Sequence, residues 1–387
     1  MPYALPYEVY EIDANNVLIG FTEEFLANPS AYDMCDTMQI PSRVISVADK
    51  AFITKKNTTS IPSFITKLTF AEGSKCSSIG GSAFKGAKLI SLIFPNSLKE
   101  IDSFAFIECS LLNYVDFSNA TNLSSIGDYV FESCYALRSI NFPRNLNSIG
   151  GLAFSGCSSL TFVSFPSNLS TIGEDVFYDC SKLDTIEWNS WNGNVSLDYT
   201  SFSGVCPDGG VINIKNPVNG HDSVELLQHL KSNGELPQTW GAALPESVYN
   251  IGDDNGVLYG FTEEFLANPS PYSGCNYMLI PANVTSIADK AFYANRSSTI
   301  PSFITNLTFV EGSVCSTIGV DAFYKSSLTT IKFNNTLQTI GLDAFADCSK
   351  LASVDFPSSL QSIGEWAFTK DYALTSISFP EDNNGKY

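Results

Sequence analysis

The apolar residues of this chain recur at fixed positions within a unit of 22 to 25 residues. Residues 160–182 show the pattern clearly, as LTFVSFPSNLSTIGEDVFYDCSK. Val163 and Phe165 are separated by one polar residue, which is the period of a strand with one buried face. Pro166 follows directly, and because proline cannot donate to a strand ladder, we expect the strand to end there. The first third of each unit is therefore predicted to be a short strand.

A second apolar group follows in the same unit. Leu169 and Ile172 are expected to point back into the core, and Gly173 permits a tight corner after them. Val176 and Phe177 are then expected to fill the core from a short irregular or 3₁₀-like turn. One copy cannot bury both sides of its apolar row, so the copies must stack on one another, as in a solenoid.

Isoleucines, most of them followed by glycine, mark the successive copies. They step by 22, 25, 23 and 23 residues in the first half of the chain and by 22 and 23 in the second: Ile79, Ile101, Ile126, Ile149 and Ile172, then Ile318, Ile340 and Ile363. This period lies within the roughly 20–29 residues of leucine-rich repeats. We therefore predict a right-handed, curved leucine-rich-repeat solenoid, made mainly of short parallel strands joined by irregular or 3₁₀ turns.

A larger repeat lies over the short one. The segment VLIGFTEEFLANPSAYDMC, from residue 17, returns as VLYGFTEEFLANPSPYSGC from residue 257, so a whole module is duplicated. In module 1 the short pattern breaks at residues 211–241, where Val224, Leu227 and Leu230 form the apolar stripe of a helix that covers the last coil. We expect module 1 at 1–240, with an N-terminal cap at about 1–43, repeats at about 44–206 and a capping strand and helix at about 207–240. We expect module 2 at 241–387, with a cap at about 241–283, repeats at about 284–387 and no C-terminal cap.

The charge balance argues against two classes of partner. The chain has 21 basic and 40 acidic residues and a net charge of −19, so phosphate backbones and anionic membrane surfaces repel it. No stretch approaches the roughly 18 apolar residues of a membrane span, and the first residues do not read as a signal peptide. We expect no nucleic-acid partner and no direct membrane insertion.

Residues that could carry catalysis or hold a metal are scarce. The two histidines, His221 and His229, are eight residues apart, which is not the spacing of a metal-binding pair. The sequence has no Cys-x-x-Cys, phosphate-binding loop, nucleophile elbow or dinucleotide fingerprint. We therefore expect no catalytic residue, no cofactor and no metal, in a protein that is not an enzyme.

Cysteine occurs ten times, and five of these residues follow a repeat phenylalanine by three positions: Cys109, Cys134, Cys157, Cys180 and Cys348. Other coils have Ala87, Ser326 or Asp371 there, so most of these residues share small size. We interpret the cysteines as packed thiols, because free cysteine behaves as a small buried apolar residue. Disulfides remain an alternative, with Cys35–Cys76 and Cys275–Cys315 as the favoured pairs, and glycosylation at Asn-x-Ser/Thr sites also remains open.

The repeated set I-G-x-x-A-F-x-x-C resembles the BspA-type leucine-rich repeat, which is found in bacterial and protist surface proteins. The resemblance covers about ten coils, from roughly residue 44 to 202 and from 284 to 379. It implies a curved solenoid, exposure at the surface, and adhesion or other protein binding. It carries no catalytic residues.

The outward positions of the strands form rows across the stacked coils. Six of these residues are predicted to bind a partner: Tyr114, Asp116, Asn141, Phe162, Ser164 and Glu187. Stacked in register, the strands would make a sheet on the concave face of the solenoid. We therefore expect an extracellular or cell-surface interaction protein that binds a protein or glycan partner through this sheet. The alternative is a structural spacer or assembly subunit of a larger surface protein, without a specific ligand.

Overall fold

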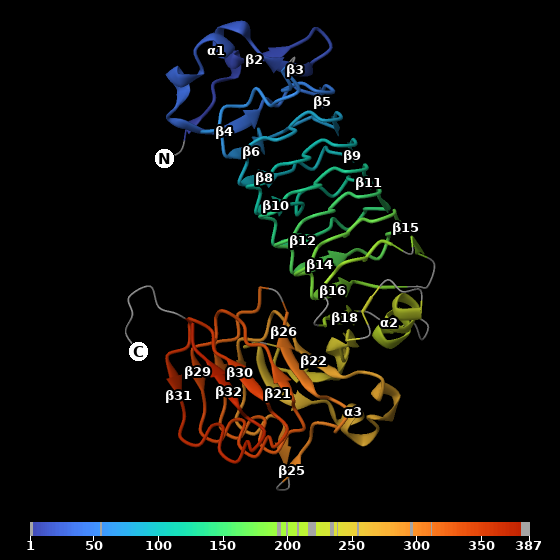
Figure 1. Cartoon of the computed structure of the whole chain (residues 1–387), viewed down its shortest axis with the longest axis vertical. Coiled ribbons are helices and arrows are strands. Elements are labelled where there is room, and N and C mark those ends of the chain that lie inside the picture. The colour runs from blue at the N-terminus through green and yellow to red at the C-terminus, as the bar shows by residue number, and fades with distance from the viewer. Residues whose placement is uncertain are drawn as a thin grey trace. The chain divides into compact units, whose positions relative to one another are not determined.

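The computed structural model describes residues 3–380 apart from short gaps at 55, 192–194, 199, 207–208, 216–221, 233–235, 238, 254, 295–296 and 311. They form two compact units, Met1–Trp240 and Gly241–Tyr387. In each unit, short parallel strands repeat along a stack of coils, and the described helices are short (Figure 1). The predicted fold class, a solenoid of stacked coils, is confirmed in both units.

Unit 1 has strands on two faces of its coils. The strands of one face, most of which have three or more residues, form what we call the wide sheet: β1 (Tyr3–Ala4), β4 (Cys35–Ile40), β6 (Lys67–Phe70), β8 (Ser91–Ile93), β10 (Tyr114–Asp116), β12 (Ser139–Asn141), β14 (Phe162–Phe165), β16 (Thr185–Trp188) and β18 (Val211–Ile214). The other face, the narrow sheet, has β2 (Tyr10–Ile12), β3 (Val17–Phe21), β5 (Ser46–Val47), β7 (Ser78–Ile79), β9 (Glu100–Ile101), β11 (Ser125–Ile126), β13 (Ser148–Ile149), β15 (Thr171–Ile172) and β17 (Ser196–Leu197). Its repeat isoleucines pair in register, as Ile126 does with Ile149.

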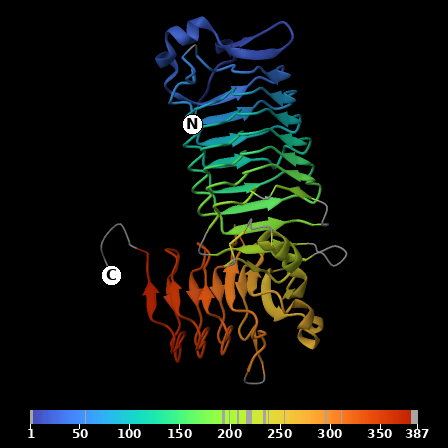
Figure 2. The same ribbon diagram turned by 45° about the vertical axis from the view of Figure 1, so that its right-hand side comes forward.

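The core of unit 1 is a stack of aromatic rings. Phe154 and Phe177, from successive coils, lie face to face with ring centroids 5.6 Å apart. The same ladder runs from coil to coil at spacings of 5.1 to 5.6 Å through Phe52, Phe84, Phe106, Phe131, Phe154, Phe177 and Phe202. All seven rings are fully buried, so each coil shelters the apolar edge of the next. Figure 2 shows the coils of unit 1 stacked on one another.

Short helices lie at both ends of unit 1. At the N-terminal end, 3₁₀ turns at Tyr7–Val9 and Pro29–Tyr32 flank α1 (Glu23–Ala27), whose first turn is capped by Thr22. At the other end, α2 (Ser223–Ser232) packs on β18, and the Ser223 Oγ accepts a 2.8 Å hydrogen bond from the Ile214 N–H. The leucines of α2 are buried, which closes the last coil. No helix in the described ranges is long and apolar enough to cross a membrane.

The repeat glycine has a different role from the expected one. Gly173 does not adopt a left-handed backbone; those angles belong to Asp175 and Asp179, at φ +50° and +58°. Instead, a Cβ on Gly173 would lie 2.6 Å from the backbone nitrogen of Gly151 in the preceding coil. The glycine is therefore required by the close approach of two coils.

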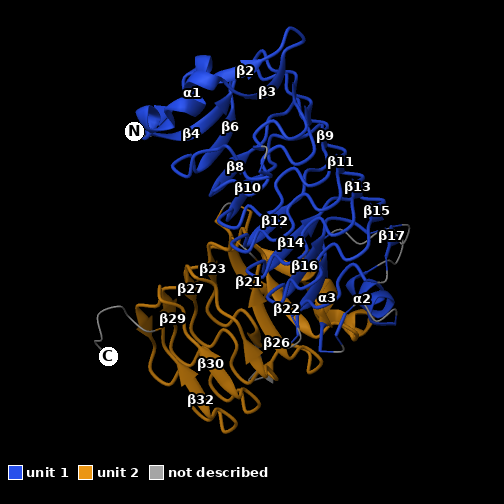
Figure 3. Ribbon diagram, turned by 45° about the horizontal axis from the view of Figure 1, so that its top comes forward, with its two compact units in different colours: residues 1–240 blue, residues 241–387 orange. Residues whose placement is uncertain are grey.

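Unit 2 repeats the same plan (Figure 3). After β19 (Gly241–Ala242) and a 3₁₀ turn at Glu246–Val248, one sheet contains β20 (Tyr249–Ile251), β21 (Val257–Phe261), β23 (Ser286–Ile287), β27 (Thr317–Ile318), β29 (Thr339–Ile340) and β31 (Ser362–Ile363). The other face has β22 (Tyr277–Ile280), β26 (Asn306–Phe309) and β28 (Thr330–Ile331), then β30 (Ser353–Asp355) and β32 (Ser376–Ser378). The helix α3 (Glu263–Ala267), a 3₁₀ turn at Ser270–Tyr272 and the hairpin of β24 (Tyr293–Ala294) with β25 (Ser297–Ser298) complete the unit.

Candidate functional site

The wide sheet of unit 1 is interrupted between β10 and β12. One hydrogen-bonded sheet ends at β10 and the next begins at β12, whereas the narrow sheet continues through β9, β11 and β13. On either side of the break, the Tyr114 N–H donates to the Ile90 carbonyl at 3.2 Å and the Thr161 N–H donates to the Arg138 carbonyl at 2.8 Å. Asn113 occupies the position in the coil of β10 that Ile90 and Arg138 occupy in their coils. Within the described residues, its carbonyl accepts no backbone hydrogen bond from the coil of β12.

The break lies beside a longer turn. Five residues, 118–122, separate Phe117 from Leu123, where three residues fill the same place in the neighbouring coils. The extra residues make two successive turns, with the Ala120 N–H donating to the Phe117 carbonyl and the Leu123 N–H to the Ala120 carbonyl. The two coils follow different paths on this side, so β10 and β12 diverge while the opposite sheet remains paired.

The distances between aromatic ring centroids in successive coils show the divergence of β10 and β12. A second aromatic ladder follows the ends of the wide strands, and its steps are 5.1 Å from Phe94 to Phe117, 5.4 Å from Phe142 to Phe165 and 4.5 Å from Phe165 to Trp188. At the break, from Phe117 to Phe142, the step is 6.3 Å. The coils therefore separate at the wide sheet and stay closely packed behind it.

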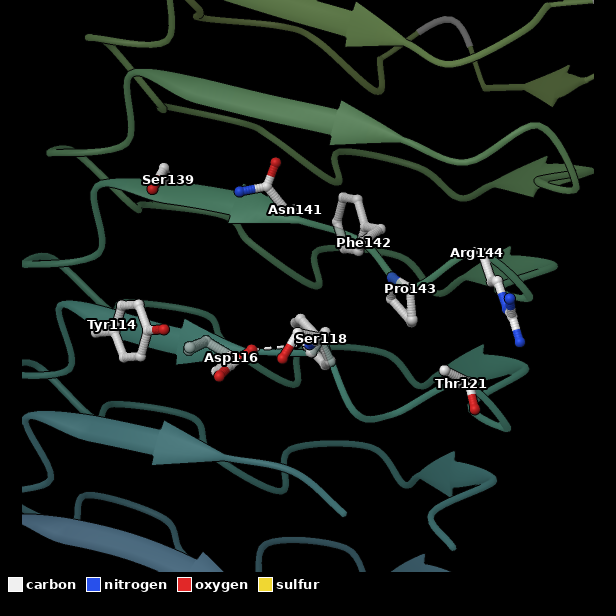
Figure 4. Close-up of a pocket in the computed structure, with 11 residues that line it drawn as sticks. Tyr114, Asp116, Ser118, Thr121, Ser139, Asn141, Phe142, Pro143 and Arg144 are labelled. Carbon is white, nitrogen blue, oxygen red and sulfur yellow. Dashed lines mark hydrogen bonds between the residues drawn. The ribbon is translucent and has the colours of Figure 1, made fainter. Parts of the chain in front are cut away.

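The separation leaves a hollow of about 460 Å³, which we call the β10–β12 groove. It is lined by Tyr114, Val115, Asp116, Phe117, Ser118, Thr121, Ser139, Asn141, Phe142, Pro143 and Arg144. Figure 4 shows Tyr114 and Asp116 on one strand, Ser139 and Asn141 on the next, and Thr121 and Arg144 at the far end. The groove thus has an aromatic end, a polar middle and a cationic end.

The polar groups of the groove are available to a ligand. Tyr114 is 53% exposed, and Asn141 and Arg144 are exposed; among the described residues, the side chains of Asn141 and Arg144 have no hydrogen-bond partner. Asp116 is half-buried and held in place, since its Oδ1 accepts a 2.8 Å bond from the Ser118 N–H. The negative charge of Asp116 raises the pKa of the Tyr114 hydroxyl above its ordinary value, which shows that the two side chains are close neighbours.

The groove brings together three of the six residues predicted to bind a partner, namely Tyr114, Asp116 and Asn141. The other three lie on β14 and β16. The expectation that Phe162 is exposed is wrong: only 4% of the residue is accessible, with Ser139 and Thr185 beside it in the ladder.

Glu187 is also buried, at 1% exposure, because it is engaged by its neighbours. Its Oε1 lies 2.8 Å from the Lys215 Nζ and accepts a 3.0 Å bond from the Ser164 hydroxyl. Ser164 and Glu187 therefore bond to each other. Thr121 and Arg144 are not among the residues predicted to bind a partner. The 25-residue step between Ile101 and Ile126 is the signal in the sequence that points to the longer turn beside them.

A comparison with known families decides the class of this chain. Residues 77–206 and 316–385, more than half of the sequence, match the family described as BspA type leucine rich repeat region. The chain belongs to the BspA-type leucine-rich-repeat family. The predicted resemblance is therefore confirmed, and no curated protein sequence matches the chain.

Solved structures of other leucine-rich chains are similar to this one. A leucine rich cell surface protein from Faecalibacterium prausnitzii is 20% identical, with 99% of this chain and 96% of that chain covered and a TM-score of 0.42. A leucine-rich repeat protein from Bacteroides ovatus is 23% identical, with 96% and 86% covered and a TM-score of 0.35.

The recurring cysteines of these BspA-type coils are free thiols with a shared partner. Each donates to the backbone carbonyl of a phenylalanine in the preceding coil: Cys109 to Phe84 (3.3 Å), Cys134 to Phe106 (3.6 Å), Cys157 to Phe131 (3.4 Å), Cys180 to Phe154 (3.2 Å) and Cys348 to Phe323 (3.3 Å). Burial raises the pKa of the Cys109 thiol to about 12. The five recurring cysteines therefore combine a small side-chain volume with a hydrogen-bond donor.

The two favoured disulfide pairs are not bonded in this structure. Cys35 and Cys76 instead donate to the carbonyls of Ala4 and Ser78, and the matching pair in unit 2, Cys275 and Cys315, donates to the carbonyls of Ala243 and Thr317. Each of these four sulfurs thus has a backbone acceptor. No group of three or more metal-ligating side chains gathers anywhere in the described part of the chain, and His221 lies outside it.

Proposed function

We propose that the chain is a non-enzymatic interaction protein, exposed at a cell surface, that binds a protein or glycan partner through the wide sheet of unit 1. The observation that carries the proposal is the β10–β12 groove. It is a polar and aromatic opening in an otherwise paired sheet, and its lining includes the exposed side chains of Tyr114 and Asn141. Membership of the BspA-type family supports an interaction role.

Mutation of the groove tests the proposal. The full chain is immobilised and exposed to a glycan array and to a panel of purified extracellular proteins, and the experiment is repeated with the double variant Tyr114→Ala/Asn141→Ala. Both residues are exposed, so we expect capture to fall at least tenfold while the melting temperature stays within about 2 °C, as is usual for surface substitutions.

Tyr178→Ala is the matched control. Tyr178 is 50% exposed, against 53% for Tyr114, and it lies in a turn rather than on a wide strand. Its loss should leave capture unchanged. If the double variant captures as well as the parent chain, the groove is not the binding surface, and the interpretation as a structural spacer is favoured.

A further inference from the structure

The shape of the β10–β12 groove restricts what it can hold. The groove is a single gap, closed on one side by the paired strands β8 and β10 and on the other by β12 and β14. Its volume of about 460 Å³ lies in the range of about 300–1,000 Å³ that is usual for small-molecule sites. The ligand group that enters it is therefore compact.

An extended peptide does not fit the gap in the plane of the sheet. Inserting a strand would require β10 and β12 to stand two strand spacings apart, about 9.6 Å. Behind the groove, the rings of Phe117 and Phe142 are 6.3 Å apart, and β11 stays paired in register with β13. The coils cannot open by another strand width without breaking the narrow sheet.

The chemistry of the lining matches a sugar ring. A pyranose has an apolar C–H face and a rim of hydroxyls that both donate and accept hydrogen bonds. The groove offers the half-exposed ring of Tyr114 beside the carboxylate of Asp116, which only accepts, and the amide of Asn141, which does both. The Ser139 side chain lines the groove from the same strand as Asn141.

We propose that the β10–β12 groove is a subsite for one uncharged pyranose ring, stacked on Tyr114 and bonded through its hydroxyls to Asp116 and Asn141. The inference rests on the proposed function and names its ligand class. The carboxylate of Asp116 and the net charge of −19 disfavour a sulfated, phosphorylated or sialylated ring in the middle of the groove. Arg144 lies at the far end, where it can donate to a hydroxyl of the adjoining sugar.

Ligand-observed NMR on the full chain tests the inference. The probes are the methyl glycosides of glucose, galactose, mannose and N-acetylglucosamine, each titrated separately, with a dissociation constant on the order of 1 mM expected for a single ring. Tyr114→Ala and Asp116→Asn should each weaken the preferred glycoside about tenfold or more, which is the size of one stacking contact or one hydrogen bond to a charged group. Tyr114→Phe, which keeps the ring, should stay within about threefold, and Tyr178→Ala should have no effect.

Each alternative result is informative. Binding of all four glycosides too weak to titrate, together with Tyr114-dependent capture of a protein, overturns the sugar inference and leaves the proposed function intact. Glycoside binding that survives both Tyr114→Ala and Asp116→Asn places the sugar elsewhere and overturns the assignment. Stronger binding of a sulfated or sialylated glycoside than of its neutral parent also overturns it. Absence of any capture, by sugar or protein, refutes both proposals together.

Discussion

Removing the sulfur of Cys157 tests how the coils are held together. This thiol is fully buried, it follows the core residue Phe154 by three positions, and it donates to the Phe131 carbonyl of the preceding coil at 3.4 Å. Cys157→Ala therefore removes one buried heavy atom and one hydrogen-bond donor in a single step. Cys157→Ser removes volume but keeps a donor, and a serine already occupies the equivalent position at Ser326.

The expected loss is modest but measurable. Deleting a buried group of methylene size costs about 0.8 kcal/mol in transfer free energy, with a further contribution from the cavity that remains. Loss of a weak S–H···O bond adds about 0.5–1 kcal/mol. The free energy of unfolding should therefore fall by about 1.5–2 kcal/mol in Cys157→Ala, and the melting temperature of unit 1 by about 3–8 °C. Cys157→Ser should lie between Cys157→Ala and the parent chain.

Urea unfolding followed by tryptophan fluorescence measures this loss in the full chain. Trp188, Trp191 and Trp240 are buried in unit 1, whereas Trp366 in unit 2 is 66% exposed, so the signal reports mainly on unit 1. A reducing agent should not shift the midpoint, because all ten cysteines are free. An alanine variant as stable as the parent would refute the packing argument. A serine variant no better than alanine would refute the hydrogen-bond part.

Three further changes test other features. Gly173→Ala should destabilise unit 1 by about 1–3 kcal/mol in urea unfolding, because its new Cβ would meet backbone atoms of the preceding coil at 2.6 to 3.0 Å. Gly151→Ala should cost much less, because its Cβ would meet a flexible side chain and a carbonyl at 3.2 Å or more. Equal losses in the two variants would contradict the close-approach argument. Burial raises the pKa of Asp371 to about 7, above its unfolded value, so the folded protein binds the proton more tightly and unit 2 should lose stability as the pH rises from about 4 to 7. Asp371→Asn should remove that loss, and a variant with the same pH profile as the parent would exclude Asp371 as its source. A thiol reagent at pH 8 should label the half-buried Cys35 and Cys206 in the folded chain and reach the eight buried cysteines only on unfolding, as counted by intact mass; more than two labels before unfolding would contradict the packing.

The regular part of the fold could be predicted because each coil repeats the same physical requirement. Phe154 and Phe177 occupy the same place in successive repeats, and stacking the coils buries both rings. The structure shows this stacking, with the two ring centroids 5.6 Å apart. The apolar stripe of residues 224–230 likewise coincides with the described helix α2. Where the pattern repeats, the position of a residue within the repeat predicts whether its side chain is buried.

The departures arise where a residue's surroundings come from another coil. The alternation of apolar and polar residues along each strand predicts that Phe162 and Glu187 point outward. It does not show that Glu187 forms an ion pair with Lys215 at the end of the next strand, or that the Phe162 ring is buried. Gly173 is a further departure, because the pattern marks a special backbone position without showing whether a backbone angle or a neighbouring coil requires the glycine. The groove depends on a two-residue difference in one turn, and periodicity alone gives no measure of its effect on the sheet.

The interrupted wide sheet has a mechanical consequence for unit 1. A stretching force applied along the stack passes from coil to coil through the two sheets and through backbone hydrogen bonds between successive turns, such as the one from the Phe131 N–H to the Ala153 carbonyl. Between β10 and β12 the wide sheet is not paired, so only the narrow sheet and the turns transmit the force. Because this junction lacks one of the sets of hydrogen bonds that its neighbours have, we expect shear to deform it before them. A molecule bound in the groove would bridge the two coils there, so occupancy and resistance to pulling are coupled at one place in the fold.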